Sequence, residues 1–355
     1  MDVKEITLEK LLYGAREMGC TDVHLTVGAS TVLRLNGNLV DSGLLLKSED
    51  VEKLILSLID EKQKMELDRN IDLDFTFSSS DGYRHRVNIF KHRGKLAAII
   101  RLLKSELMEL KEINIPEVLF DFSLISPGFY LISGPSGSGK TTTMASIIDK
   151  YNKSVISHIL SIENPLEYLY ENGKSIVHQR EVGKDVNSVY DAITSSSHED
   201  VDILAIGEFT DFDSLDAAVS AAESGRMVIG TINSNNVAQT IDRVIDLCPL
   251  ERQAQFRIKF ANALKAIISQ KLIPSSDLSS ILLINEILVG TDSTLNVVRQ
   301  GKTNQLITAI QSGASLGMHT FNSDLARLYN AGKITKEIAI KYTPDKNDLM
   351  QYIRN

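Results

Sequence analysis

The feature that most constrains the fold is the octapeptide GPSGSGKT at residues 134–141, which fits the pattern G-x-x-x-x-G-K-[ST]. A short apolar stretch, residues 129–133, precedes it directly, and helix-forming residues follow it. Glycines in such a loop let the backbone curl and aim its N–H groups inward, and the helix adds the positive end of its dipole. The sequence therefore predicts a P-loop that holds the phosphates of a nucleotide.

Individual residues of the loop have expected roles. Lys140 should reach the β- and γ-phosphates of ATP, and the Thr141 hydroxyl should ligate Mg²⁺. The residues expected to contact the nucleotide are Gly134, Pro135, Ser136, Gly137, Ser138, Gly139, Lys140, Thr141 and Thr142.

Short apolar stretches alternate with helical patterns beyond the loop, at residues 158–163, 202–208 and 227–232. This alternation predicts a parallel sheet with helices on its faces. A further strand is expected at residues 281–288.

Two of these strands end in a carboxylate. Ligands of open α/β sheets lie outside the carboxyl ends of the strands. We therefore expect Glu208 to hold Mg²⁺, partly through water, and Glu163 to orient or deprotonate the attacking water. The alternative for each residue is a solvated carboxylate at a strand end.

The N-terminal part has a different pattern, which predicts a small α+β domain with a mostly antiparallel sheet. Its expected elements are an amphipathic helix at residues 7–19, a hairpin turn at Asn36-Gly37, a helix capped by Ser48, a second hairpin turn at Asp81-Gly82 and a strand at residues 95–103.

The domain organisation follows from these patterns. We expect an N-terminal domain at residues 1–105, a linker at 106–127, the P-loop domain at 128–290 and a helical tail at 291–355.

Composition narrows the class of protein. The chain has 38 basic and 46 acidic residues, only 6% aromatic residues and no Trp, which disfavours a nucleic-acid partner. No apolar run is long enough to cross a bilayer and nothing marks the N-terminus for export, so we expect a cytoplasmic protein. Two distant cysteines, Cys20 and Cys248, predict neither a disulfide framework nor a zinc site.

The segments SIENP, HQREVG, AAESG and TIDRVID, in this order, resemble the PilT-type retraction ATPases of type IV pili and their relatives in type II secretion. The N-terminal segment GCTDVHLTVGA is similar to the PAS-like domain of that family, and the resemblance extends over residues 5–330. It implies a PAS-like α+β domain, a RecA-like P-loop NTPase domain and a helical C-terminal tail. Assembly-type relatives commonly carry a paired CxxC zinc insert, which two scattered cysteines cannot form, so the retraction type is favoured.

The resemblance also implies an activity and partners. Such proteins form homo-hexameric rings that couple ATP hydrolysis to pilus retraction, the basis of twitching motility. They act at the cytoplasmic face of the membrane, associating with it only through partners such as an inner-membrane pilus platform protein. A paralogous pilus ATPase is a further candidate partner.

In this family, arginines on the N-terminal strands are delivered to the nucleotide. The positions of this sequence that match are Arg84, Arg86, Arg93 and Arg101. Any one of them could equally be a solvated charge on a strand.

Several residues depart from the family pattern. Asn164 stands where an Asp usually follows the catalytic Glu, and Asn233 stands in place of a His. Thr210 interrupts the usual Glu-Met-Arg-Asp, residues 192–200 lack the usual arginines, and residues 293–296 read STLN rather than AIRN.

These departures leave two main functions open. One is an active retraction motor, and the other is an accessory or regulatory ring subunit that binds ATP but hydrolyses it weakly or not at all. Intact Glu163 and Glu208 favour the first. A DNA translocase would share the RecA-like core, but the acidic charge disfavours it.

Overall fold

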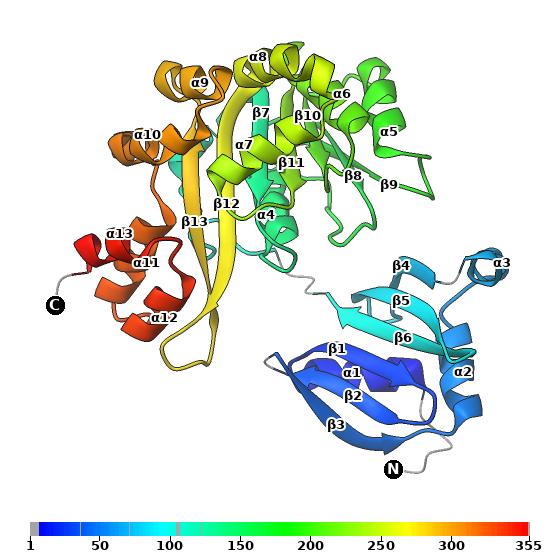
Figure 1. Cartoon of the computed structure of the whole chain (residues 1–355). Helices are drawn as coiled ribbons and strands as arrows, with labels where there is room; N and C mark the ends of the chain where they lie inside the picture. The colour runs from blue at the N-terminus through cyan, green and yellow to red at the C-terminus, as the bar shows by residue number, and fades with distance from the viewer. Residues whose placement is uncertain (1–6, 36, 71, 104–106, 122, 354–355) are drawn as a thin grey trace. The chain divides into compact units, whose positions relative to one another are not determined.

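The computed structural model describes residues 7–35, 37–70, 72–103, 107–121 and 123–353 (Figure 1). The chain divides into two compact units. The first comprises Met1–Glu106 together with Pro165–Leu169, and the second comprises Leu107–Asn164 and Tyr170–Asn355.

The first unit is built on a six-stranded sheet in the order β3-β2-β1-β6-β5-β4, and every pairing in it is antiparallel. Its strands are β1 (Cys20–Thr26), β2 (Ser30–Leu35), β3 (Asn38–Leu45), β4 (Asp72–Ser78), β5 (Arg84–His92) and β6 (Lys95–Leu102). Its helices are α1 (Leu8–Glu17), α2 (Ser48–Leu56) and α3 (Glu61–Arg69). The expected α+β domain with an antiparallel sheet is confirmed.

Details of this unit differ from the expectation. Gly37 and Gly82 have φ of 82° and 83°, as tight turns between paired strands require, while Asn36 lies outside the described residues. Ser48 is the first residue of α2 rather than its cap, and no side chain caps that helix. The α3 helix was missed, although Asp60 and Gln63 form a capping box at its start.

The second unit is built on a seven-stranded sheet in the order β13-β12-β7-β11-β10-β8-β9, parallel except for the β12–β13 pair. Its strands are β7 (Gly128–Ser133), β8 (His158–Glu163), β9 (Ile176–Glu181), β10 (Ile203–Ile206), β11 (Met227–Ile232), β12 (Leu264–Pro274) and β13 (Ile281–Val289). Its first helices are α4 (Lys140–Ser154), α5 (Val189–Ser195), α6 (Phe212–Glu223), α7 (Val237–Asp246) and α8 (Gln253–Ala263). The expected parallel-sheet domain is confirmed.

Alternate residues of β7 pack into two different cores. Phe129 and Leu131 join a core with α6, α7 and α8, whereas Tyr130 and Ile132 join a core with α4. Both faces of the sheet are therefore covered, which explains why the strands read as continuous apolar runs.

Two strands of this sheet were not expected. The β12 strand begins at Leu264, directly after α8 ends at Ala263, so no Gly or Pro marks the change from helix to strand. The β9 strand lies at the edge of the sheet and is mostly not buried, so it has no apolar run.

Residues 107–121, part of the segment expected to be a linker, pack into the second unit. Leu110, Ile113, Ile115 and Phe120 are buried in the same core as Tyr130. The segment therefore contributes to the hydrophobic core beside α4.

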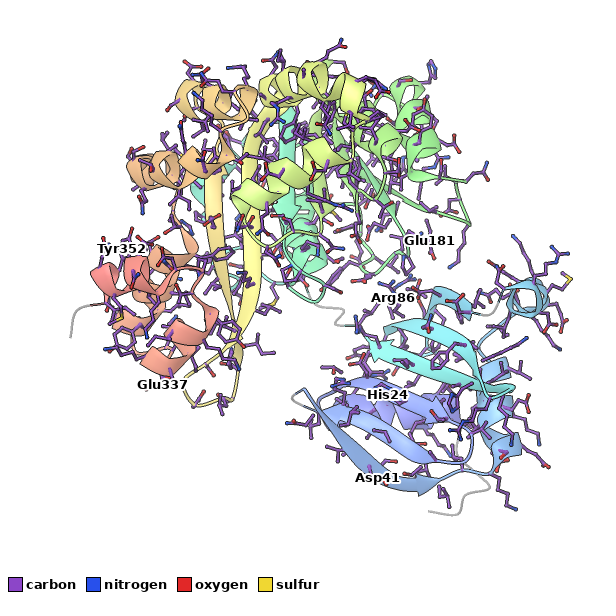
Figure 2. All side chains as sticks on the ribbon, in the orientation of Figure 1. His24, Asp41, Arg86, Glu181, Glu337 and Tyr352 are labelled. Atoms are coloured by element: carbon purple, nitrogen blue, oxygen red, sulfur yellow. The ribbon has the colours of Figure 1, made fainter. Side chains whose placement is uncertain are left out.

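The expected helical tail is also present. It contains α9 (Asp292–Arg299), α10 (Leu306–Ser312), α11 (Phe321–Asn330), α12 (Lys336–Tyr342) and α13 (Lys346–Tyr352). Figure 2 draws the side chains of these helices, with Glu337 of α12 and Tyr352 of α13 labelled. Within the described part of the chain, no helix combines the length and the apolar character that crossing a membrane requires.

Candidate nucleotide-binding site

The P-loop connects the buried strand β7 to helix α4. Gly137 and Gly139 have φ of 75° and 87°, a region that other residues rarely adopt. At Gly134 a side chain would collide with the Ser138 hydroxyl and the Gln270 carbonyl. The glycines are therefore needed both for the curl of the loop and for its close approach to β12.

Gln270 supports the loop from the neighbouring strand. Its side chain is 1% exposed, and its Nε2 donates to the Ser138 carbonyl at 2.8 Å. Sequence reasoning missed this residue because no sequence signal places β12 beside the loop.

Lys140 begins α4 and folds back over the loop. Its Nζ donates to the carbonyls of Gly134 at 2.9 Å and Pro135 at 3.1 Å, and to Oδ1 of Asn233 at 2.6 Å. Burial lowers the pKa of Lys140, and the nearby Glu208 charge opposes that shift. The ammonium group is thus held at the mouth of the loop by three oxygen atoms.

Asn233 links Lys140 to Glu208. It directly follows β11, and its Nδ2 donates to the Glu208 carboxylate. The three residues lie beyond the carboxyl ends of three adjacent strands, β7, β11 and β10.

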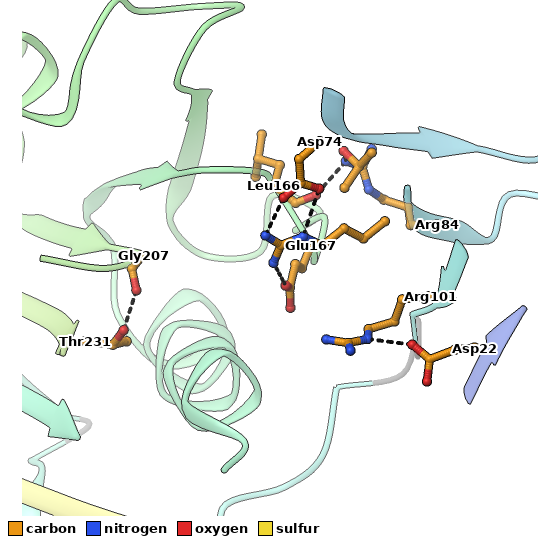
Figure 3. A network of polar contacts seen from close by, with 10 residues as sticks. Asp22, Asp74, Arg84, Arg101, Leu166, Glu167, Gly207 and Thr231 are labelled. Atoms are coloured by element: carbon orange, nitrogen blue, oxygen red, sulfur yellow. Dashed lines mark hydrogen bonds and ion pairs between the residues drawn. The ribbon is translucent and has the colours of Figure 1, made fainter. Parts of the chain in front are cut away.

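Glu163 ends β8, the next strand along this edge. Its carboxylate is 3% exposed and accepts from the Ser161 hydroxyl at 2.5 Å. Ile162 lies opposite Ile206 in the β8–β10 pairing, which places Glu163 beside Gly207, the residue before Glu208. The Thr231 hydroxyl of β11 binds the Gly207 carbonyl and ties these strand ends together (Figure 3).

The structure therefore brings the P-loop, Glu163 and Glu208 to one edge of one sheet. Pro135, Ser136 and Glu208 are exposed there, and Thr141 and Thr142 are half-buried. Such an edge offers backbone N–H groups and one cation for phosphates, and hydroxyl and carboxylate oxygens for a divalent ion.

Three of the four arginines lie near one end of the β5–β6 pair within the first unit, and Figure 3 labels two of them, Arg84 and Arg101. Arg84 donates to the Thr76 hydroxyl at 2.5 Å and to the Leu166 carbonyl at 2.7 Å. Arg86 forms ion pairs with Asp74 at 2.7 Å and with Glu167 at 3.3 Å. The hydrogen bond to Asp74 is the main reason why the pKa of Arg86 is raised.

Arg101 belongs to the same group. It lies opposite Arg86 in the β5–β6 pairing, and its Nε donates to Asp22 at 3.0 Å. Arg93 does not join them, because it forms the turn at the other end of the β5–β6 pair, with φ of 51°. Seven residues along a strand separate it from Arg86 by about 23 Å.

No metal-binding cluster is found among the residues that the structure describes. They include no group of three or more His, Cys, Asp or Glu side chains that could hold a metal ion. Cys20 and Cys248 are buried free thiols whose pKa is raised by burial.

Fold and site together define a P-loop NTPase of the RecA-like class. Residues 68–345 match the family model described as Type II/IV secretion system protein, and the chain belongs to this family. The match covers the whole P-loop domain, most of the helical tail and part of the N-terminal unit.

Among known proteins, the chain is similar to the type IV pilus retraction ATPase PilT of Pseudomonas aeruginosa. The two are 35% identical over 340 residues, which cover 96% of this chain and 97% of the other. It is also 31% identical to the type IV pilus ATPase PilU of the same organism, over 98% of this chain and 91% of the other. A crystal structure of the pilus retraction motor PilT with bound ADP covers 98% of this chain with a TM-score of 0.88 and 36% identity.

Proposed function

We propose that this protein is an ATP-hydrolysing motor subunit of a type IV pilus machine and drives pilus retraction. The observation that carries the proposal is similarity to a retraction ATPase over nearly the full length of both chains. The residues that phosphate binding and hydrolysis need, Lys140, Thr141, Glu163 and Glu208, are all present at one sheet edge.

The loop binds the phosphates. Its backbone N–H groups and the start of α4 supply positive potential, and Lys140 exchanges the loop carbonyls and Asn233 for phosphate oxygens. Glu163 then orients or deprotonates the attacking water, and the Ser161 hydroxyl holds this carboxylate in place.

The residues also fit Mg²⁺. Hard divalent ions prefer oxygen ligands, and the Thr141 hydroxyl and Glu208 carboxylate supply them beside the loop. When bound, Mg²⁺ neutralises charge on the β- and γ-phosphates. Asn233 donates to Glu208 and so helps to orient this ligand.

We place the protein in a homo-hexameric ring at the cytoplasmic face of the membrane, held there by a platform protein. In the ring, Arg84, Arg86 and Arg101 of one subunit would contact the nucleotide of its neighbour. Each must first leave its present partners, which include Asp74, Glu167 and Asp22. Arg93 is too far along the strand to belong to this group.

A second candidate function is an accessory ring subunit with weak hydrolysis. The observation in its favour is Asn233, which stands where the family has a His and bonds both Lys140 and Glu208. An amide cannot carry a proton as an imidazole can. With Asn233 in place of the His, ATP hydrolysis would therefore be coupled less strongly to motion of the hexameric ring.

Two measurements test these functions. The first is the steady-state ATPase rate of purified protein, with Lys140→Ala as the inactive control. The second is the number of surface pili after deletion of the gene, because fibres accumulate when retraction stops. A motor shows Lys140-dependent turnover and a hyperpiliated deletion strain. An accessory subunit shows little ATP turnover alone and more when its paralogue is added. A deletion strain with a normal number of pili would exclude a role in retraction.

A further inference from the structure

Glu286 is a buried carboxylate on β13. It belongs neither to the P-loop nor to the acids at the strand ends. It is 6% exposed, and its Oε1 accepts the backbone N–H of Val237 at 2.9 Å. The Phe321 N–H also faces this carboxyl and lowers its pKa, as the Val237 N–H does. Val237 and Phe321 are the first residues of α7 and α11, so one carboxylate binds the N-terminus of α7 and faces that of α11.

Several groups around Glu286 favour its charged form, in opposition to burial. Burial raises its pKa, whereas the two amides and the Lys271 charge oppose that shift. Lys271 lies on the neighbouring strand β12, and its Nζ is 4.6 Å from the centroid of the Phe321 ring. Helix dipoles and one cation therefore replace the water that an exposed carboxylate would have.

The helix that Glu286 holds leads directly to the nucleotide site. Asn233 lies four residues before Val237, and Asn236 caps α7 by accepting the Gln239 N–H at 2.8 Å. Since so few residues separate them, the position of the first turn of α7 limits where Asn233 can lie.

The same segment has a second anchor on the P-loop strand. The Ser234 hydroxyl lies 2.6 Å from that of Thr240, which donates to the Ser133 hydroxyl at 2.7 Å. Ser133 directly precedes the P-loop, and its hydroxyl lies 2.5 Å from that of Ser269, the residue opposite Glu286. Residues 233–237 are thus held from β7 on one side and from β13 on the other.

We propose that Glu286 is a positioning residue for ATP hydrolysis, which fixes the first turn of α7 so that Asn233 stays bonded to Glu208 beside the P-loop. The inference rests on the proposed ATPase function, because the placement of Asn233 affects turnover only where the site hydrolyses ATP. Glu286 itself touches no reacting atom. It acts through the Val237 amide.

The first test is kinetic and uses Glu286→Gln, which keeps the size of the side chain but removes its charge. We expect kcat to fall about tenfold while the Kd for ATP stays within about twofold, because the P-loop contacts are untouched. In an Asn233→Ala background the same change should lower kcat no further. Additive losses in this double-mutant cycle would overturn the proposal.

The matched control is Asp324→Asn. Asp324 is also buried, and it accepts a backbone N–H of β13, that of Asn285, at 3.0 Å. It lies on α11 and does not hold α7, so its neutralisation should leave kcat unchanged. An equal loss of kcat in both variants would show a general effect of buried charge and would contradict the proposal.

The second test does not need turnover. Hydrogen exchange of the Val237 amide should be about fivefold faster in Glu286→Gln than in the parent, since a hydrogen bond to a charged acceptor is lost. Unchanged exchange would overturn the proposal even if kcat falls. If the parent protein binds ATP but does not hydrolyse it, the proposed ATPase function is refuted. The exchange rate of the Val237 amide then decides separately whether Glu286 positions α7. If Glu286→Gln does not fold, Glu286→Asp gives the same two readouts.

Discussion

The amide oxygen of Asn233 lies 2.6 Å from the ammonium nitrogen of Lys140. The other end of the same amide donates to Glu208. A residue that departs from the family pattern therefore joins the lysine of the P-loop to the proposed magnesium ligand. Any phosphate oxygen that binds Lys140 has to compete with Asn233.

The first prediction concerns Lys140. Lys140→Ala should weaken ATP binding about 100-fold or more, because it removes charge-assisted hydrogen bonds to the phosphates. Isothermal titration calorimetry measures this directly. The control is Lys153→Ala on the same helix, an exposed residue paired with Asp149, which should bind ATP normally. Unchanged affinity in Lys140→Ala would remove the basis of the P-loop assignment.

The second prediction separates binding from turnover at Glu163. Glu163→Gln should keep the parental Kd for ATP and lose about 100-fold or more in kcat, the usual contribution of a general base. The control is Asp202→Asn, at the opposite end of the adjacent strand β10, which should hydrolyse ATP normally. If Glu163→Gln turns over at the parental rate, another group activates the water.

The third prediction restores family residues. Asn164→Asp with Asn233→His should raise kcat about tenfold, which corresponds to about 1.4 kcal/mol of transition-state stabilisation. The Kd for ATP should not change, because the phosphate loop already supplies ground-state binding. Steady-state kinetics of the single and double variants show which position matters. A double variant as slow as the parent would point instead to the missing arginines or to an accessory role.

The fourth prediction tests whether arginines act on a neighbouring subunit. Arg86→Gln should lower kcat about 1000-fold in the ring, the usual range for an arginine that meets a transferring phosphate. Mixing it with Lys140→Ala subunits should restore part of the activity, since each supplies what the other lacks. Arg93→Gln, the control at the other end of β5, should be near parental. Failure of the mixture to recover activity would argue against an arginine supplied between subunits.

The fifth prediction concerns pH and the first unit. His85 is buried, its Nε2 lies 3.2 Å from Arg16 and 3.1 Å from the Ser79 hydroxyl, and burial lowers its pKa to about 4. The unfolded chain would bind a proton near pH 6.5 and the folded chain only near 4. Stability should therefore fall as the pH falls through this window, by at most about 1.4 kcal/mol per pH unit.

Urea unfolding at pH 7 and pH 5 measures this effect. In His85→Gln the loss of stability between the two pH values should be smaller than in the parent, because the titrating group is gone. The same pH dependence in both proteins would assign it to other residues.

Much of the site could be read from the sequence because the P-loop is local. Eight consecutive residues contain the glycines, the lysine and the hydroxyl, and their conformation depends mainly on their own backbone freedom. The positions of Glu163 and Glu208 at this sheet edge could also be predicted, since parallel strands end at the same edge and both acids stand at the ends of apolar strands. Their catalytic roles stay predictions.

The residues that support the site could be identified only from the tertiary structure. Gln270 meets Ser138, and Glu286 meets Val237, across long stretches of chain that no local pattern connects. Strand pairing likewise placed Arg101 opposite Arg86 and left Arg93 in the turn at the other end, although the family resemblance grouped all three. Sequence determines conformation where a few neighbouring residues limit the backbone, whereas contacts between distant segments depend on how whole strands and helices pack.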